Sequence, residues 1–248
     1  MRTLAIVNLK GGSCKTTTAV SLAACLGEKG RRVLLVDLDP AGNASWWLGA
    51  AAERGTYDVL VKGLPLVDAA VPTTARRVDI VPATEWLARA EYELKNRQAL
   101  QKAMAALPPG RWDYVLLDSP PSLTVLSVNA LAAAHEVLVP VVAHVLSLAG
   151  LKQLLQAVEL TRQQLNPGLK VAGLLACRVN RTRHVRAIQE ELRRFAGDLL
   201  LRTVIRENIR LAEAPSFRQP ITIYAPDSIG AEDYRQLARE IMKQEGKA

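Results

Sequence analysis

The stretch "KGGSCKTTT", Lys10–Thr18, decides the fold of this 248-residue chain. It lies between an apolar run that predicts a strand, "RTLAIVNL", and an alanine-rich run that predicts a helix, "AVSLAACL". A glycine-rich turn between a strand and a helix directs several backbone N–H groups toward one point, where the helix dipole adds positive potential. The arrangement predicts a loop that holds phosphate.

Two side chains of this loop suit phosphate chemistry. Lys15 would reach the outer phosphates of a nucleotide, and the Thr16 hydroxyl would hold Mg²⁺. The usual phosphate loop reads G-x-x-x-x-G-K-[ST]. Leu9 and Cys14 occupy its two glycine positions here, so the strict pattern fails at both ends.

A variant pattern with an early lysine fits better: lysine, two glycines, any residue, glycine, lysine, threonine. Only Cys14 departs from it, and the stretch resembles the deviant Walker A motif of the ParA/MinD group of ATPases. The resemblance implies ATP and Mg²⁺ as cofactors. It also implies that Lys10, which acts with Lys15 in catalysis, crosses a dimer interface to the partner's nucleotide, so that a positive charge arrives only when two subunits meet. The implied nucleotide contacts of the loop are Lys10, Gly11, Gly12, Ser13, Cys14, Lys15, Thr16 and Thr17.

Cys14 stands where the pattern requires glycine, and three interpretations are open. If the backbone there needs a positive φ, a side chain costs about 1–2 kcal/mol; if the helix has already begun, a small side chain costs little. A tolerated substitution is the favoured interpretation. The others are a thiol that oxidises and blocks phosphate, and a nucleotide-binding protein with impaired catalysis.

Two further strand patterns end in carboxylates. "LLVDLDPAGN" carries Asp37 and Asp39, and the resemblance implies that Asp39 positions the attacking water while Pro40 and Asn43 line the nucleotide. Asp37 is expected either to have a structural role or to contact the ligands of Mg²⁺ rather than the ion itself. The family usually has glutamine where this chain has Ala41.

"YVLLDSPPS" predicts a Walker B strand whose Asp118 binds Mg²⁺ through water. Asn180 follows the strand pattern "VAGLLACRV" and offers both a donor and an acceptor to an adenine edge. Asparagine is also an ordinary turn residue, so a structural role for Asn180 stays open.

The whole chain alternates strand and helix patterns, and several strands are unbroken apolar runs typical of parallel strands buried on both faces. We expect an α/β fold: one doubly wound, mostly parallel sheet with helices on both faces, forming a single P-loop ATPase domain over residues 1–248. The predicted strands are Thr3–Val7, Val33–Asp37, Val78–Pro82, Tyr114–Asp118, Val137–Val141, Val171–Arg178 and Leu201–Ile205. The predicted helices are Thr16–Lys29, Thr84–Ala106, Leu123–Ala134, Leu148–Leu165, His184–Phe195 and Ala231–Gln244.

The chain is basic, with a formal net charge of +8, and Arg178 to Arg218 hold ten arginines, five acids and no lysine. Arginine suits phosphate, and no sequence-reading motif is apparent, so we expect non-specific, salt-sensitive contacts with the backbone of double-stranded DNA. A solvated helix face is the alternative. The candidate DNA contacts are Arg183, Arg186, Arg210 and Arg218.

"ENIRLAEAPSFRQPI" is similar to a stretch typical of chromosomal and plasmid ParA proteins. The resemblance implies a weak, Mg²⁺-dependent ATPase whose ATP-bound homodimer binds DNA in the nucleoid. It also implies a ParB-like partner that stimulates hydrolysis and release. A related positioning ATPase for a non-DNA cargo is the alternative.

Three cysteines without C-x-x-C spacing favour a reducing cytoplasm over a disulfide framework. In the last helix pattern, Tyr234, Leu237, Ala238, Ile241 and Met242 recur at helical spacing, which predicts docking against the domain rather than a membrane anchor.

Trp46 and Trp47 follow the Asp39 loop, and we expect them to pack that loop onto the domain. An aromatic contact across a dimer or with a partner is the alternative.

Overall fold

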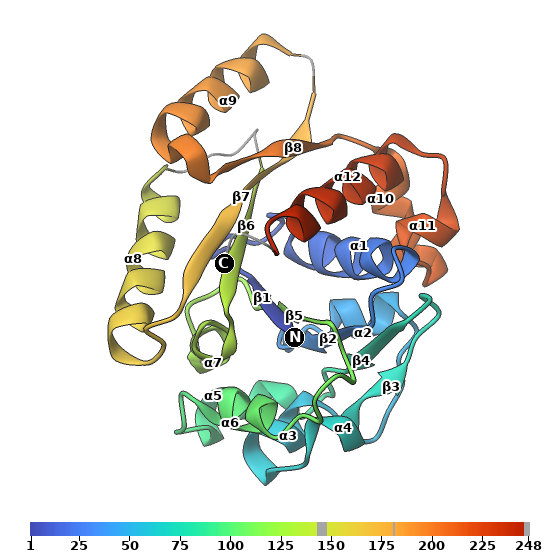
Figure 1. Ribbon diagram of the computed structural model, residues 1–248, viewed down its shortest axis with the longest axis vertical. Coiled ribbons are helices and arrows are strands. Elements are labelled where there is room, and N and C mark those ends of the chain that lie inside the picture. Colours follow the sequence, from blue (N-terminus) through green and yellow to red (C-terminus); the bar gives the residue numbers. More distant parts are fainter. Residues whose placement is uncertain (143–147, 181, 246–248) are drawn as a thin grey trace.

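An eight-stranded sheet forms the centre of the molecule in a computed structural model that describes residues 1–142, 148–180 and 182–245 (Figure 1). The strands run in the order β3-β4-β2-β5-β1-β6-β7-β8, and all are parallel except the pair β3–β4. All seven predicted strands are present, and β3 is an addition. The strands are β1 (Arg2–Ile6), β2 (Val33–Asp37), β3 (Val71–Pro72), β4 (Val78–Val81), β5 (Tyr114–Asp118), β6 (Glu136–Val142), β7 (Lys170–Val179) and β8 (Leu200–Arg206).

Helices cover both faces of the sheet, as expected for a doubly wound fold (Figure 1). The first half of the chain contributes α1 (Lys15–Glu28), α2 (Asn43–Trp47), α3 (Thr56–Lys62), α4 (Leu66–Ala69), α5 (Leu87–Glu93), α6 (Ala99–Ala105) and α7 (Val125–Ala133). The second half contributes α8 (Leu148–Gln164), α9 (Arg183–Ala196), α10 (Ile209–Glu213), α11 (Ile221–Tyr224), α12 (Ile229–Lys243) and the 3₁₀ turns η1 (Gly197–Leu199) and η2 (Ala214–Phe217).

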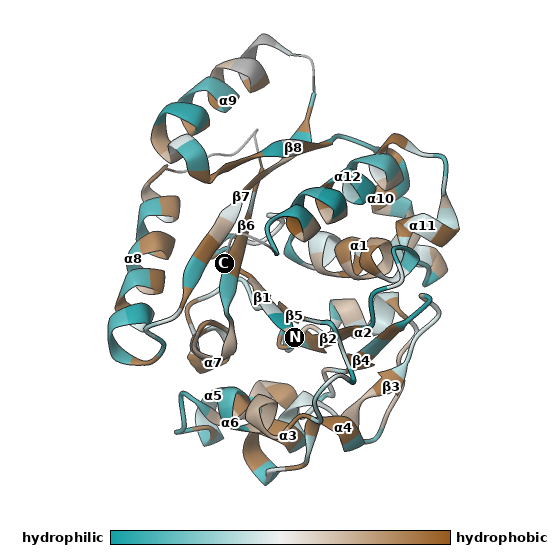
Figure 2. Ribbon diagram, in the orientation of Figure 1, coloured by the Kyte–Doolittle hydropathy of each residue, from teal (hydrophilic) through white to brown (hydrophobic). Residues whose placement is uncertain are grey.

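The central strands are buried on both faces because helices pack above and below them. Every residue of β2 and β5 is buried. One apolar cluster joins the sheet to α3–α8, and a second joins the other face to α1, α2, α11 and α12. In Figure 2 the hydropathy follows this arrangement: α8, for example, is brown along one side and teal along the other. The α/β fold class is therefore confirmed.

The single helix predicted over residues 84–106 is wrong, because the chain breaks between α5 and α6. The Asn96 side chain accepts a hydrogen bond from the Gln98 N–H, which forms a local turn. Asn129 on α7 then donates to the Asn96 carbonyl and accepts from the Leu100 N–H at the start of α6. A buried amide from another helix therefore stabilises the break, by satisfying backbone groups that a helix end leaves unpaired.

The last helix, α12, docks as predicted and also protects the edge of the sheet. Tyr234, Leu237, Ala238 and Ile241 are fully buried. On the same helix, Glu240 accepts hydrogen bonds from the N–H groups of Arg202 and Thr203 on the edge strand β8. Asp233 likewise accepts from the Arg206 N–H and pairs with the Arg206 guanidinium. These carboxylates occupy donors that an exposed edge strand would offer to another chain.

The two tryptophans after β2 have different environments. Trp47 is buried and its indole N–H donates to the Gln219 carbonyl at 2.7 Å, so the predicted packing of the loop is confirmed there. Trp46 is 48% exposed, so the packing prediction is wrong for that residue. Its ring instead lies under the guanidinium of Arg218, at 5.7 Å from ring centroid to Cζ.

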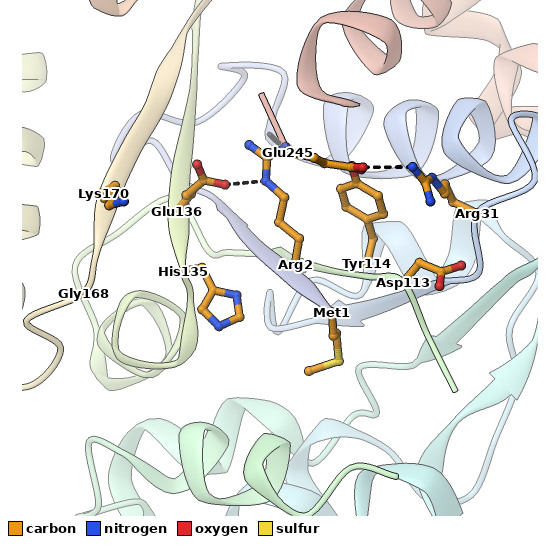
Figure 3. Close-up of a pocket in the computed structure, with 10 residues that line it drawn as sticks. All are labelled: Met1, Arg2, Arg31, Asp113, Tyr114, His135, Glu136, Gly168, Lys170 and Glu245. Carbon is orange, nitrogen blue, oxygen red and sulfur yellow. Dashed lines mark hydrogen bonds and ion pairs between the residues drawn. The ribbon is translucent and has the colours of Figure 1, made fainter. Parts of the chain in front are cut away.

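The amino ends of the strands surround a cavity on the side of the sheet away from the Lys10–Thr18 loop (Figure 3). Four of its charged groups form ion pairs across it: Arg2 with Glu136, and Arg31 with Glu245. Arg2 also donates to the Ile241 carbonyl and the Gln244 side chain, which ties the first strand to the end of α12. The cavity therefore lies among contacts that join the two ends of the described chain.

Gly27 tests the close contact between α1 and the turn before β4. A Cβ at this position would lie 2.1 Å from the Arg76 carbonyl oxygen. Although alanine favours a helix by about 1 kcal/mol over glycine, we expect Gly27→Ala to lower the free energy of unfolding by at least about 2 kcal/mol. Urea denaturation measures this. Gly168→Ala is the control, because its Cβ meets nothing closer than 3.7 Å; equal stability of the two variants would contradict the packing.

Candidate active site

The candidate site forms where the carboxyl ends of parallel strands meet, as in other open α/β sheets. The Lys10–Thr18 loop follows β1, and α1 begins at Lys15. Asp118 ends β5, directly beside Ile6 of β1 on one side and Asp37 of β2 on the other. The strand register therefore places two carboxylates next to the loop.

A cavity of about 370 Å³ lies over the start of α1 and gathers most of the predicted contacts. Its lining is Gly11, Gly12, Ser13, Cys14, Lys15, Thr16, Thr17, Asp39, Ala41, Asn43 and Pro121. Residues from three separate loops thus meet in one hollow, which we call the loop cavity. Lys10, Pro40 and Asn180 do not line it, and Lys10 is exposed at its rim.

Lys15 is held beneath the loop. It is only 6% exposed, and its Nζ donates to the Lys10 carbonyl at 3.2 Å. Burial lowers the pKa of Lys15, and the nearby carboxylates of Asp118 and Asp39 oppose that shift. The ammonium is thus a desolvated cation at the floor of the cavity, where an anion would interact with it far more strongly than in water.

Asp118 is a buried acid without its complement of hydrogen bonds. Both carboxylate oxygens are buried and lack a partner of normal hydrogen-bond geometry among the described residues. The Thr16 hydroxyl lies beside the carboxyl. Burial raises the pKa of Asp118, and the charges of Asp37 and Asp39 raise it further. Such a group is costly unless a cation or donor completes it, so Thr16 and Asp118 fit a divalent ion that prefers oxygen ligands.

Asp37 differs from Asp118 because its hydrogen bonds are filled. Its carboxylate accepts from the Ser45 hydroxyl at 2.6 Å, the Ser45 N–H at 2.9 Å and the Asp39 N–H at 3.2 Å. Burial still raises the pKa of Asp37 to about 6. These contacts anchor α2 to β2, so Asp37 holds the loop that carries Asp39.

Cys14 adopts the left-handed backbone conformation, with φ 67° and ψ 23°, immediately before α1. The helix has therefore not begun at this position, and the low-cost explanation for a non-glycine residue is wrong. The Cys14 side chain is half-buried, and the thiol of Cys177 on β7 lies beside it. This contact lowers the pKa of Cys14 against the opposing effect of burial.

A second, larger cavity of about 630 Å³ adjoins the loop cavity and shares Gly12, Cys14 and Thr17 with it. Sequence reasoning missed most of its walls, because only the pairing of β7 with β8 brings these residues beside the loop. The remaining lining is Arg178, Ile205, Arg206, Glu207, Asn208, Ile209, Leu211, Ala212 and Tyr234. Asn180 lies near this region, donates to Glu207 at 3.1 Å and accepts from the Thr182 hydroxyl at 2.7 Å.

Of the four predicted DNA-contacting arginines, the structure describes the side chains of two. Arg210 and Arg218 are exposed, and Arg210 pairs with Glu213 at 2.9 Å. Glu213 also accepts from the Tyr224 hydroxyl, and Tyr224 stacks on Phe217. The side chains of Arg183 and Arg186 on α9 lie outside the described part of the structure.

Comparison with known proteins identifies the family. Residues 1–171 match the family described as an AAA domain. The chain is 43% identical over 246 residues to the sporulation initiation inhibitor protein Soj of Bacillus subtilis, covering 96% of this chain and 97% of that protein. It is 46% identical over 243 residues to the chromosome-partitioning ATPase Soj of Thermus thermophilus, covering 98% and 96%.

Solved structures share the fold over nearly the whole chain. Cobyrinic acid a,c-diamide synthase of Mycobacterium smegmatis, crystallised with ADP and magnesium, is 34% identical with a TM-score of 0.85 and covers 98% of this chain and 95% of its own. The septum site-determining protein MinD of Pyrococcus horikoshii, complexed with Mg-ADP, is 28% identical with a TM-score of 0.82, covering 99% and 98%. The chain belongs to the ParA/Soj family of chromosome-partitioning ATPases. Within the described residues, no helix has the length and apolarity needed to cross a membrane.

Asp118→Asn tests the buried charge. We expect the nucleotide-free variant to be more stable than the parent at neutral pH by about 1–3 kcal/mol, because a neutral amide removes an uncompensated buried carboxylate. A raised folded pKa destabilises the native state only above the unfolded pKa near 4. The difference in free energy of unfolding between Asp118→Asn and the parent should therefore disappear as the pH falls toward 4. Denaturation at several pH values measures it.

Asp37→Asn is the matched control for Asp118→Asn. Burial raises the pKa of Asp37 as well, but its carboxylate accepts three hydrogen bonds that an amide cannot all accept, so Asp37→Asn should gain less stability at neutral pH than Asp118→Asn. Destabilisation by both substitutions would contradict the assignment of Asp118 as the uncompensated group.

The backbone at residue 14 predicts an order of stabilities for substitutions there. Cys14→Gly should leave the free energy of unfolding within about 1 kcal/mol of the parent, since relief at positive φ is offset by greater freedom of the unfolded chain. Cys14→Val should cost about 2 kcal/mol or more, because a β-branched side chain rarely adopts this conformation. Thermal unfolding of the two variants measures the difference, and a valine variant as stable as the glycine variant would contradict the left-handed geometry.

Proposed function

We propose that the chain is a single-domain, weak, Mg²⁺-dependent ATPase that drives DNA partitioning. The single observation that carries this proposal is a buried Lys15 in the lining of the loop cavity whose charge acts on a nearby buried Asp118, a carboxylate with no geometric hydrogen bond. Each group is unfavourable alone, and a nucleotide phosphate with a divalent ion supplies the charges that both lack. Family membership supports the same ligand.

The phosphates would lie in the loop cavity and the nucleoside in the adjoining cavity. The backbone N–H groups of residues 11–15 and the start of α1 suit an anion. No group of three His, Cys, Asp or Glu side chains among the described residues could hold a metal by itself. Thr16 and Asp118, the latter through water, would therefore hold Mg²⁺ together with phosphate oxygens. The bound ion would supply charge neutralisation at the phosphates.

Hydrolysis would depend on the chain's own side chains around the outer phosphate. Asp39 lines the cavity, and its carboxylate accepts a hydrogen bond from the Ala41 N–H at 3.0 Å, which fixes its orientation. It would orient the attacking water, while Lys15 stabilises negative charge that develops on the phosphoryl group. This chain has Ala41 where the family usually has glutamine. The lack of that side chain would favour slow ATP hydrolysis in the absence of a partner.

Dimerisation would bring Lys10 into the site of a second copy. Lys10 is exposed and directly precedes Gly11, which lines the loop cavity, so a partner subunit docked over this loop would meet it. A charge supplied in trans would make hydrolysis and dimer formation depend on the same nucleotide.

DNA binding in the nucleoid would use the exposed arginines. Arg210 and Arg218 lie on the α10–η2 segment, which contacts α2 beside the loop cavity. Arg183 and Arg186 on α9 remain candidates. Such contacts would be backbone-directed and non-specific. A ParB-like partner would stimulate hydrolysis and release the dimer from DNA.

Lys10→Ala tests the link between nucleotide and DNA. We expect the parent to co-sediment with duplex DNA at least tenfold more with ATP and Mg²⁺ than with ADP, and to lose this retention as salt rises. Lys10→Ala should bind a fluorescent ATP analogue normally, yet stay monomeric and lose the ATP-dependent retention.

Lys170→Ala, at the amino end of β7 on the side of the sheet away from the loop, is the control and should behave like the parent. The proposal fails if the parent stays monomeric with ATP and Mg²⁺ under reducing conditions and retains DNA equally in every nucleotide state. ATP-dependent dimerisation without any DNA retention would favour a different cargo.

A further inference from the structure

We propose that Cys14 and Cys177 form a redox-active thiol pair, which a peroxide converts into a disulfide that joins the phosphate loop to β7. The two residues are 163 positions apart in sequence, yet Cys14 packs against the apolar cluster that contains Cys177, and the two thiols lie close enough to interact. Neither cysteine belongs to a recognisable redox motif. The pairing is a property of this chain's tertiary structure.

The surroundings give the two sulfurs different access. Cys14 is half-buried and lines both cavities of the candidate active site, so a small oxidant can reach it. Cys177 is fully buried and lines neither cavity, and its thiol approaches the Leu175 carbonyl at 3.6 Å. An accessible sulfur in front of a shielded one is the arrangement in which the first is oxidised and the second resolves it.

The third cysteine provides an internal comparison. Cys25 is buried within α1, and the charged groups that act on it are those of Glu28, Arg235, Lys29 and Glu232. It lines neither cavity of the site. Cys25 therefore serves as a comparison for the pair formed by Cys14 and Cys177.

The chemistry balances with hydrogen peroxide as the two-electron oxidant. The Cys14 sulfur attacks one peroxide oxygen, the O–O bond breaks, and one water leaves as Cys14 becomes a sulfenic acid. The Cys177 sulfur then attacks the Cys14 sulfur, the S–O bond breaks, and a second water leaves as the disulfide forms. Two thiols and one peroxide thus give one disulfide and two waters, and a dithiol reductant reverses the reaction.

The consequence for the site rests on the proposed function. Cys14 immediately precedes α1 and borders the loop cavity, so a bond to β7 would fix the loop at the point where phosphate must approach the backbone. We expect the disulfide to weaken nucleotide binding at least tenfold. Conversely, bound ATP would cover Cys14 and slow its oxidation.

The test maps the bond directly. The full chain, with and without Mg-ATP, is treated with hydrogen peroxide, capped with iodoacetamide and digested without reductant for mass spectrometry. We expect a cross-linked peptide pair containing Cys14 and Cys177, formed more slowly with Mg-ATP and lost on adding dithiothreitol. Cys25→Ala should give the same cross-link, and Cys177→Ala should give none.

Nucleotide binding separates this proposal from simple damage to the loop. Peroxide should lower the affinity of the parent for a fluorescent ATP analogue at least tenfold, with full recovery in dithiothreitol. Oxidised Cys14 without a bond to Cys177 in the parent would overturn the proposal, as would cross-links involving Cys25 instead. If the reduced parent binds no nucleotide, the proposed function fails, while the peptide map still decides the thiol pair.

Discussion

The interaction on which the site depends is the unbalanced charge buried at the carboxyl end of β5. Asp118 is held between β1 and β2 by the strand register, and neither of its oxygens has a completed hydrogen bond. The buried charge of Lys15 lowers the pKa of Asp118, but the Lys15 Nζ donates its hydrogen bond to the Lys10 carbonyl. The folded chain therefore holds an acid and a base whose charges are best satisfied by a ligand that carries both anionic oxygens and a cation.

The rest of the fold keeps this arrangement rigid. Helix α1 is buried along most of its length between the sheet and α12, and the Thr18 hydroxyl hydrogen-bonds to Tyr234 of α12 at 3.2 Å. Asp37 ties α2 to β2 through Ser45. The loop is therefore joined to a helix that is packed on both sides. Asp39 lies between β2 and α2, which Asp37 and Ser45 hold together. Preorganised charges of this kind favour electrostatic catalysis because they need little rearrangement during reaction.

The positions of the main acids and of the loop could be predicted because local sequence determines them. Apolar runs that end in aspartate identify Asp37 and Asp118, and parallel strands bring their carboxyl ends together. The break at Asn96 could not be predicted, because the Asn129 amide that stabilises it is 33 residues away. Glu207 and Asn208 were missed for a related reason: only the pairing of β7 with β8 brings them beside Cys14.

The cysteine at position 14 shows how the same backbone constraint can be met by a residue other than glycine. The left-handed conformation costs about 1–2 kcal/mol for a side chain, so some other contact must offset it. The Cys14 side chain packs against the apolar cluster that contains Cys177, and the two thiols lie beside each other. A glycine would remove the strain but also this contact. The contact with Cys177 on β7 therefore offsets the backbone strain at Cys14. The same contact places a second thiol next to the phosphate loop.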